Sequence, residues 1–379
     1  MALVLHDEQR MVKDVADSFF AENAPVAELR RLRDSRDADG FNRDLWAKMA
    51  ELGFVGVIIP EEYDGAGLGM VAAGLIQEAI GRNLSLSPFL STSILSVTAI
   101  LKGGTEAQKQ ALLPKMAAAE LIVALACDER ARHQPQHVAT RAEKSGNGFR
   151  LNGAKTFVLD GHVADRLIVV ARTSGADDDD NGISLFLLDP KASGVDIRRR
   201  SLVDSRNAAE ITLRNVQVDG ADLLGEIDGG HAILAAALDA GRACLAAEML
   251  GVSAQSFDTS VEYLRQREQF GAKIGSFQAL QHRAAALFCE MELLRSVVLK
   301  ALSELEEGGE RASFFASLAK AKAAEVCILA TNEAVQMHGG IGMTDEFDIG
   351  FYMKRARAAA TTFGDQAFQG DCLARAEGY

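Results

Sequence analysis

The chain has few of the residues that build metal sites or disulfide frameworks. Only five cysteines occur in 379 residues, with no C-x-x-C pair and no histidine cluster at metal-ligand spacing. Structural zinc sites and disulfide-rich folds need such clusters. We therefore expect no metal site, and reduced thiols that mainly pack, as in a cytosolic protein. The five are Cys127, Cys244, Cys289, Cys327 and Cys372.

Basic charge and long apolar runs are also scarce. Lys and Arg number 40 against 53 Asp and Glu, which gives a formal net charge of −13. This balance argues against a general basic field for nucleic acid or an anionic membrane. No segment reaches the ~20 apolar residues of a membrane span, and no basic region followed by an apolar stretch opens the chain. We expect a soluble, cytoplasmic protein without a membrane span or nucleic-acid partner, whose ligand is a small molecule.

What the chain does have is 48% hydrophobic residues and enough length for two or three domains. Up to about residue 120 the apolar spacing is helical, as in Leu45, Met49 and Leu52. Pro60 and the glycine-rich run 65–69 interrupt it with a loop, and a further helix is expected over 105–118.

The texture changes between about residues 121 and 217, where short β runs alternate with Gly, Asn and Asp clusters. This pattern predicts a compact antiparallel β domain. The acidic stretch 177–180 is expected to be a solvated loop tip, because like charges repel. The predicted strands cover 122–125, 148–151, 167–170, 183–188 and 209–213.

From about residue 229 to 376 the chain is helical again, with four helix-length segments broken at 270–276, 307–310 and 339–342. Four long helices with short breaks predict an up-down bundle. The fold class is therefore α+β. We expect an N-terminal helical domain (1–120), a middle antiparallel β domain (121–225) and a C-terminal four-helix bundle (226–379).

Two glycine-containing clusters could bind a ligand. In Arg267-Glu-Gln-Phe-Gly the guanidinium lies just before a helix break, within reach of a diphosphate or carboxylate oxygen. A surface arginine that caps a helix is the alternative. In Gln336-Met-His-Gly-Gly-Ile-Gly, paired glycines permit close approach of a planar ligand, although a plain helix-terminating turn would look the same.

Together these clusters resemble the R-x-x-F-G and Q-x-x-G-G-x-G motifs of the acyl-CoA dehydrogenases, and the resemblance covers essentially the whole chain. It implies the same three-domain fold, an FAD cofactor, an acyl-CoA substrate and at least a dimer, because each FAD lies mainly against a neighbouring subunit. The implied FAD-binding residues are Arg267, Phe270, Gln278, Gln336, Gly339 and Gly340.

The family's catalytic base is missing from both of its usual positions. Where members carry Y-E-G-T, this chain has Phe363-Gly364-Asp365-Gln366, and in the second position, L-D-x-E-R, it has Gly241. Asp365 is a possible substitute, although a turn or helix-capping aspartate fits better, since proton abstraction tolerates little misplacement. Glu248 lies nearly two helical turns beyond Gly241, and we expect it to be solvated or paired.

The predicted β domain departs from the family as well. The flavin-contacting T-E-P-x-A-G-S-D segment is Cys127-Asp-Glu-Arg-Ala-Arg-His-Gln134 here, and the W-I-T or W-I-S strand is Phe157-Val158-Leu159. The small, turn-forming motif has thus become bulky and charged. A hydroxyl that would serve as a donor near flavin N5 is absent.

These departures suggest the small, F-G-D type of subunit, which pairs with a glutamate-bearing sister subunit in a heterotetramer, including those that degrade steroids or other lipids. An electron-transfer flavoprotein would then accept the electrons. A self-sufficient homotetramer and a non-catalytic scaffold remain as alternatives. Arg242, next to Gly241, is a possible substrate residue, although a salt bridge to a carboxylate such as Asp239 is the simpler interpretation.

Overall fold

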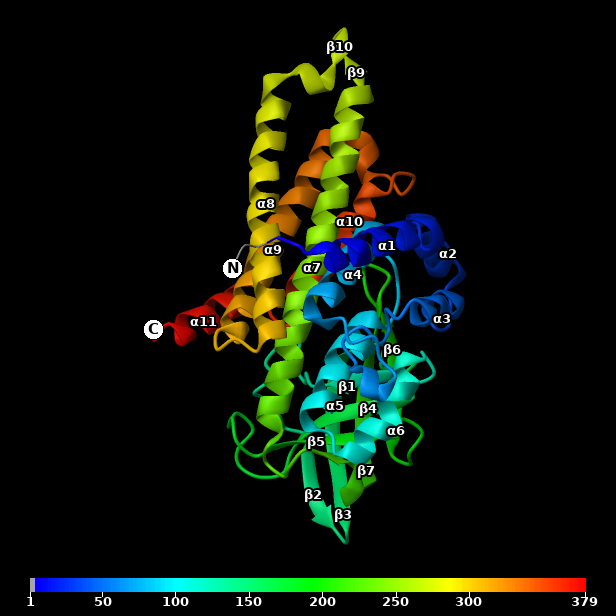
Figure 1. The fold of residues 1–379 in the computed structure, drawn as a ribbon, viewed down its shortest axis with the longest axis vertical. Helices are drawn as coiled ribbons and strands as arrows, with labels where there is room; N and C mark the ends of the chain where they lie inside the picture. The colour runs from blue at the N-terminus through cyan, green and yellow to red at the C-terminus, as the bar shows by residue number, and fades with distance from the viewer. Residues whose placement is uncertain (1–3) are drawn as a thin grey trace. The chain divides into compact units, whose positions relative to one another are not determined.

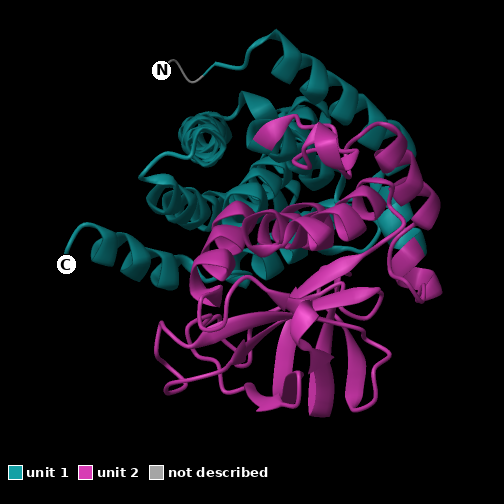
Figure 2. Ribbon diagram, turned by 60° about the horizontal axis from the view of Figure 1, so that its bottom comes forward, with its two compact units in different colours: residues 1–31, 70–85, 242–379 teal, residues 32–69, 86–241 magenta. Residues whose placement is uncertain are grey.

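The computed structural model describes residues 4–379, whose elements are shown in Figure 1. The chain divides into two compact units (Figure 2). The first unit comprises residues up to 31, together with 70–85 and 242–379, and the second comprises 32–69 and 86–241.

The first unit is helical. Its main helices are α1 (Asp7–Asn23), most of α4 (Gly69–Asn83), the longer part of α7 (Gly230–Gln266), α8 (Gln278–Glu307), α9 (Ala312–His338), α10 (Ile349–Thr361) and α11 (Gln366–Ala376). Helix α9 packs against α8, α10 and α11. Alanine is the commonest residue on its buried side, which lets the helix axes approach closely.

Helices α4 and α7 cross at two glycines. A Cβ on Gly81 would lie 2.1 Å from the carbonyl oxygen of Glu248, and a Cβ on Gly251 would lie 2.0 Å from that of Glu78. No side chain larger than hydrogen fits at either position. This close crossing brings Glu248 of α7 against α4.

The predicted breaks in the C-terminal region coincide with the ends of α7, α8 and α9. The fourth predicted segment is wrong in one respect, because it is two helices, α10 and α11. The chain turns between them at Phe363 (φ 57°) and Gly364 (φ 101°), two left-handed residues that a helix cannot accommodate.

The second unit is built on an eight-stranded sheet in the order β6-β7-β3-β2-β4-β5-β8, with β1 paired to β4. The prediction of a purely antiparallel domain is wrong in one respect. The sheet is mixed, since β1 and β2 each pair with β4 in parallel. The strands are β1 (Val123–Ala126), β2 (Arg141–Ser145), β3 (Gly148–Leu159), β4 (Arg166–Arg172), β5 (Ile183–Leu188), β6 (Val195–Ser201), β7 (Asn207–Asp219) and β8 (Leu223–Leu224).

Sequence reasoning missed β2 and β6 because both are highly charged. Strand β6 lies at the edge of the sheet, and its central Arg198, Arg199 and Arg200 give no alternating apolar signal. Strand β2 alternates one buried residue, Ala142, with charged neighbours. Polar strands of this kind are positioned by pairing with their neighbours rather than by burial.

Helices of the second unit are α3 (Arg43–Glu51), α5 (Val97–Gly103) and α6 (Glu106–Ala117), together with the π-helix η2 (Phe89–Ser96). The Thr92 and Ser96 hydroxyls both donate to the carbonyl oxygen of Val123, which fastens η2 to β1. Leu45 and Met49 are buried as the helical spacing predicts. Leu52 is not, because it is the C-cap residue of α3 and is 46% exposed.

Within the described residues, no helix is both long and apolar enough to cross a bilayer.

Candidate active site

Arg267 directly follows α7 and leads into a two-residue hairpin formed by β9 (Glu268–Gln269) and β10 (Ala272–Lys273). Phe270 (φ 55°) and Gly271 (φ 75°) form the turn, both in the left-handed region. Such turns normally carry Asn-Gly. Here the aromatic ring at the turn is 92% exposed and Arg267 is exposed beside it, as groups that contact a ligand or a second chain would be.

The second motif lies at the end of α9. Gln336, Gly339 and Gly340 are exposed, and Cβ atoms added to the two glycines would meet nothing within 4 Å. His338, which precedes the two glycines, is buried, with its ring 4.4 Å from that of Tyr263 and 4.8 Å from that of Phe347. A ligand can thus approach the backbone of the glycine pair closely, while the packed ring of His338 holds that backbone in place.

The six predicted FAD-binding residues therefore belong to one unit, and all are exposed, including Gln278 at the start of α8. Their open surface fits the adenosine and diphosphate end of a flavin nucleotide, and a guanidinium is a suitable diphosphate ligand. Their individual roles remain predictions.

The turn at the base position is built around Gly364. At its φ of 101°, a Cβ would lie 2.3 Å from Cδ1 of Phe368 and 2.7 Å from Nε2 of Gln369. A side chain here would be strained by the backbone and blocked by its neighbours. The position therefore excludes a glutamate as well as lacking one.

Three side chains hold this turn by its carbonyl oxygens. Lys320 is fully buried in α9 and donates from Nζ to the oxygens of Ala360 (3.0 Å) and Gly364 (3.1 Å). Gln369 Nε2 donates to the oxygen of Phe363 at 2.7 Å. Arg242 Nε approaches the same oxygen at 3.4 Å. The turn is thereby fixed from helices α7, α9 and α11.

Asp365 caps α11. Its carboxylate accepts a hydrogen bond from the backbone N–H of Phe368 at 2.9 Å, and its side chain is exposed. This is the ordinary use of an aspartate at a helix N-cap. The geometry agrees with the helix-capping interpretation and gives no support for Asp365 as a base.

Glu248 is committed elsewhere. It is 1% exposed, and its Oε1 accepts from Arg355 at 2.8 Å while Oε2 accepts from Gln77 Nε2 at 2.7 Å. Both partners of the ion pair are buried. The paired, hydrogen-bonded carboxylate of Glu248 joins α4, α7 and α10.

Arg242 is 7% exposed, and its guanidinium carbon lies 5.7 Å from the centre of the Phe368 ring. Together with its approach to the Phe363 carbonyl, this places Arg242 against the F-G-D turn. Gly241 precedes it inside α7 and is buried. The helix thus presents no carboxylate at the second base position.

In the second unit, the segment 127–140 is bonded to itself and to the sheet. Asp128 accepts from the Gln134 backbone N–H (3.4 Å) and lies 2.9 Å from His133 Nδ1. Glu129 accepts from the backbone N–H groups of Ala139 (2.8 Å) and Thr140 (3.0 Å). The backbone N–H groups of Gln134, Ala139 and Thr140 are therefore engaged within the unit.

Glu129 also forms a buried ion pair with Lys155, with 2.6 Å between Oε1 and Nζ. Lys155 Nζ donates in addition to the carbonyl oxygen of Cys127 at 3.1 Å. Burial lowers the pKa of Lys155, opposed by the adjacent carboxylate. Burial alone would raise the pKa of Glu129, but Lys155 and the Thr140 amide bring it below its ordinary value.

Phe157, two residues along β3, interrupts the pairing with β7. It has φ 50° and lies in the irregularity between Lys155 and Val158, with 52% of its surface exposed. A bulky residue in this conformation is unusual, and bulges often aim a side chain. The strand thus presents an aromatic side chain, while the hydroxyl expected two residues later is replaced by Leu159.

Sequence reasoning missed the residues that fix these segments, notably Lys320, Lys155 and Glu129. For the two lysines, the only signal was a charged residue within an alanine-rich or alternating apolar pattern. Such a lysine must be paired if it is buried. Its partners, however, lie far away along the chain.

Comparison with known proteins agrees over the whole chain. Family models for the acyl-CoA dehydrogenase N-terminal, middle and C-terminal domains match residues 6–120, 125–216 and 228–378. The chain is 31% identical to the 3-(aryl)acrylate reductase of Clostridium sporogenes, covering 96% of each protein. It is also 31% identical to the probable acyl-CoA dehydrogenase YngJ of Bacillus subtilis, covering 99% of each.

Solved structures show the same fold. Butyryl-CoA dehydrogenase from Megasphaera elsdenii matches with a TM-score of 0.91 and 27% identity over all of both chains. A variant of the Tcur3481-Tcur3483 steroid ACAD matches with a TM-score of 0.88 and 29% identity over 98% of each chain. With its fold, glycine motifs and full-length relatives in agreement, the chain belongs to the acyl-CoA dehydrogenase family of FAD-dependent oxidoreductases.

Proposed function

We propose that this chain is the base-lacking subunit of a heteromeric acyl-CoA dehydrogenase. A sister subunit supplies the glutamate that removes the α-proton of the acyl-CoA thioester, while FAD takes the β-hydride as cofactor. An electron-transfer flavoprotein then reoxidises the reduced flavin. The single observation that carries this proposal is the packing of the turn at Gly364.

The residues around this turn are packed so that a glutamate side chain has no room. If a glutamate had only been lost, we would expect space for its side chain. Instead, Phe368 and Gln369 occupy the position a Cβ would need, and Lys320 and Arg242 approach the turn carbonyls. A carboxylate needs a precise position to abstract a proton. The turn offers none.

The β unit supports the same proposal. Glu129, Asp128 and Lys155 form bonds within and to the segment that the family uses at the flavin. Valine and leucine follow Phe157, where the family carries a hydroxyl residue. This chain's own β unit therefore fits the flavin ring poorly. No catalytic step is assigned to it.

The other unit retains what a neighbouring subunit would need. Arg267, Gln336, Gly339 and Gly340 are exposed, as expected for residues that complete an FAD site formed largely by another chain. The similarity to the Tcur3481-Tcur3483 steroid ACAD also favours a two-component assembly and a large, ring-bearing acyl group.

The test is coexpression with candidate glutamate-bearing sister proteins of the same family from the same source. We expect a stable copurifying complex that oxidises acyl-CoA, and loss of turnover when the sister's glutamate is changed to glutamine. Turnover by this chain in a homomer would contradict the proposal. Substitution of Arg267 by Ala in this chain should lower the FAD content of the complex, whereas Arg150→Ala, at an exposed arginine, should not.

A further inference from the structure

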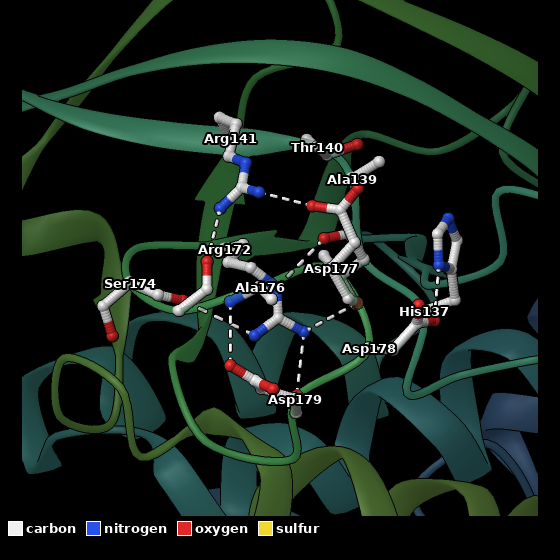
Figure 3. Close-up of polar contacts among 12 residues, drawn as sticks. His137, Ala139, Thr140, Arg141, Arg172, Ser174, Ala176, Asp177, Asp178 and Asp179 are labelled. Atoms are coloured by element: carbon white, nitrogen blue, oxygen red, sulfur yellow. Dashed lines mark hydrogen bonds and ion pairs between the residues drawn. The ribbon is translucent and has the colours of Figure 1, made fainter.

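Arg172, the last residue of β4, is among the largest fully buried side chains of the protein, with 1% of its surface exposed. Its guanidinium donates to main-chain carbonyl oxygens on two sides (Figure 3). On one side Nε donates to Val138 at 3.1 Å and Nη2 to Gln136 at 3.3 Å. These acceptors belong to the segment 127–140.

On the other side the guanidinium is wrapped by the loop 173–182. Nη1 donates to the carbonyl oxygen of Asn181 at 2.8 Å, and Nη2 donates to those of Asp179 (2.9 Å) and Asp177 (3.0 Å). The planar guanidinium has five donors in a fixed geometry, which suits it to join two segments in this way. A lysine would offer only a point charge.

The loop and the segment are also joined directly. The Val138 backbone N–H donates to the Asp177 carbonyl at 2.8 Å, and the Arg172 N–H donates to that of Thr140 at 2.8 Å. His137 Nδ1 lies 2.7 Å from a carboxylate oxygen of Asp178. The acidic tip 177–180 is largely exposed, as predicted, but it is also anchored over a buried cation that offsets its repulsion.

The bonds of Arg172 and those of Glu129 meet at the same place. Arg172 binds the carbonyls of Gln136 and Val138, and Glu129 binds the next amides, those of Ala139 and Thr140. The cation of Arg172 therefore binds two carbonyl oxygens of the segment, and the anion of Glu129 binds the two amides that follow. These hydrogen bonds join only residues of the second unit.

We propose that Arg172 is a positioning residue that holds the segment 127–140 in its self-bonded conformation. The amides of Gln134, Ala139 and Thr140 then donate to Asp128 and Glu129 instead of to a ligand. The inference deepens the proposed function, since it rests on that proposal for the idea that this segment withholds its donors from flavin. The hold on the segment itself stands on the hydrogen bonds alone.

The test is amide hydrogen exchange on the purified full chain, comparing wild type with Arg172→Ala, Arg172→Lys and the control Arg150→Ala. Arg150 is an exposed arginine of the same sheet, paired with Glu143. In Arg172→Ala we expect exchange at Val138, Ala139 and Thr140 to be at least about tenfold faster, with partial recovery in millimolar guanidinium ion. Arg172→Lys carries the test if the alanine variant does not fold, and should also exchange faster.

Unchanged exchange at these three amides in a folded Arg172 variant would overturn the inference. So would equal acceleration throughout the chain without recovery by guanidinium, because that would indicate general destabilisation. A parallel FAD titration of the wild-type chain separates the two proposals. Tight FAD binding by the wild type would contradict the proposed function, while the exchange comparison would still decide the role of Arg172.

Discussion

The ammonium group of Lys320 donates a hydrogen bond to the carbonyl oxygen of Gly364 over 3.1 Å, inside the helical unit and out of contact with water. A second bond from the same group, to Ala360, fixes the end of α10. A buried lysine thus holds the turn that stands where family members place their base. Its removal would take a charged donor away from both carbonyl oxygens.

Lys320→Met should therefore lower the free energy of unfolding by about 2 to 3 kcal/mol, because buried acceptors lose a charged donor. Lys322→Met is a matched control on the same helix, since Lys322 pairs near the surface with Glu290 at 2.6 Å. Its cost should stay below about 1 kcal/mol. Urea denaturation measures both, and equal effects would argue against a special role for Lys320.

Restoring a carboxylate at the base position should not restore activity. Gly364→Glu must adopt φ near 101° and displace Phe368, so we expect a lower melting temperature and no acyl-CoA oxidation by the chain alone. Gly370→Ala, in α11 where a Cβ meets nothing, should be neutral or slightly stabilising. A folded, active Gly364→Glu variant would disprove the reading of this turn.

Asp365 should matter for stability but not for chemistry. Asp365→Ala removes the N-cap of α11 and should cost about 1 kcal/mol, whereas Asp365→Asn keeps an acceptor and should cost less. Turnover by the coexpressed complex should be unaffected by either change. Loss of turnover in Asp365→Asn, with stability retained, would instead mark Asp365 as a substitute base.

Breaking the Glu248–Arg355 pair should be costly. Glu248→Gln leaves a buried guanidinium without its counter-ion and should destabilise the protein by about 3 to 5 kcal/mol. The double variant Glu248→Leu with Arg355→Met should recover most of that loss. Thermal unfolding of Glu248→Leu, of Arg355→Met and of the double variant forms the test. Additive losses would show that the two charges act independently.

Asp160 gives a pH dependence of known sign. Burial raises its pKa to about 6, opposed by the hydrogen bond from Ser91 (2.6 Å), whereas the unfolded chain titrates near 3.8. The folded protein therefore keeps this proton longer, so the group's stabilising contribution is full below about pH 4 and is lost as the pH rises to about 6. Asp160→Asn should gain up to about 3 kcal/mol relative to wild type at pH 7 and nothing near pH 4, by denaturation at each pH. A constant difference across this range would contradict the assignment.

The sequence predicted the three-region helix and strand organisation because long periodic segments carry strong signals. It also showed that Gly364 occupies the base position, since the loss of a glutamate is visible in a motif, but it did not predict the helix break there. The polar strands β2 and β6 were not predicted, because pairing with neighbouring strands holds them rather than burial. The hydrogen bonds of Lys320 and Arg172 could not be predicted because their acceptors are backbone carbonyls, which every residue has.

The most direct measurement is the number of FAD molecules per polypeptide in the chain purified alone, from its visible absorbance after denaturation. The account predicts little or no flavin, and uptake only after assembly with a glutamate-bearing sister subunit. Near-stoichiometric FAD in the chain alone would contradict it. A complete site would then form despite the self-bonded segment 127–140 and the missing hydroxyl after Phe157 in β3.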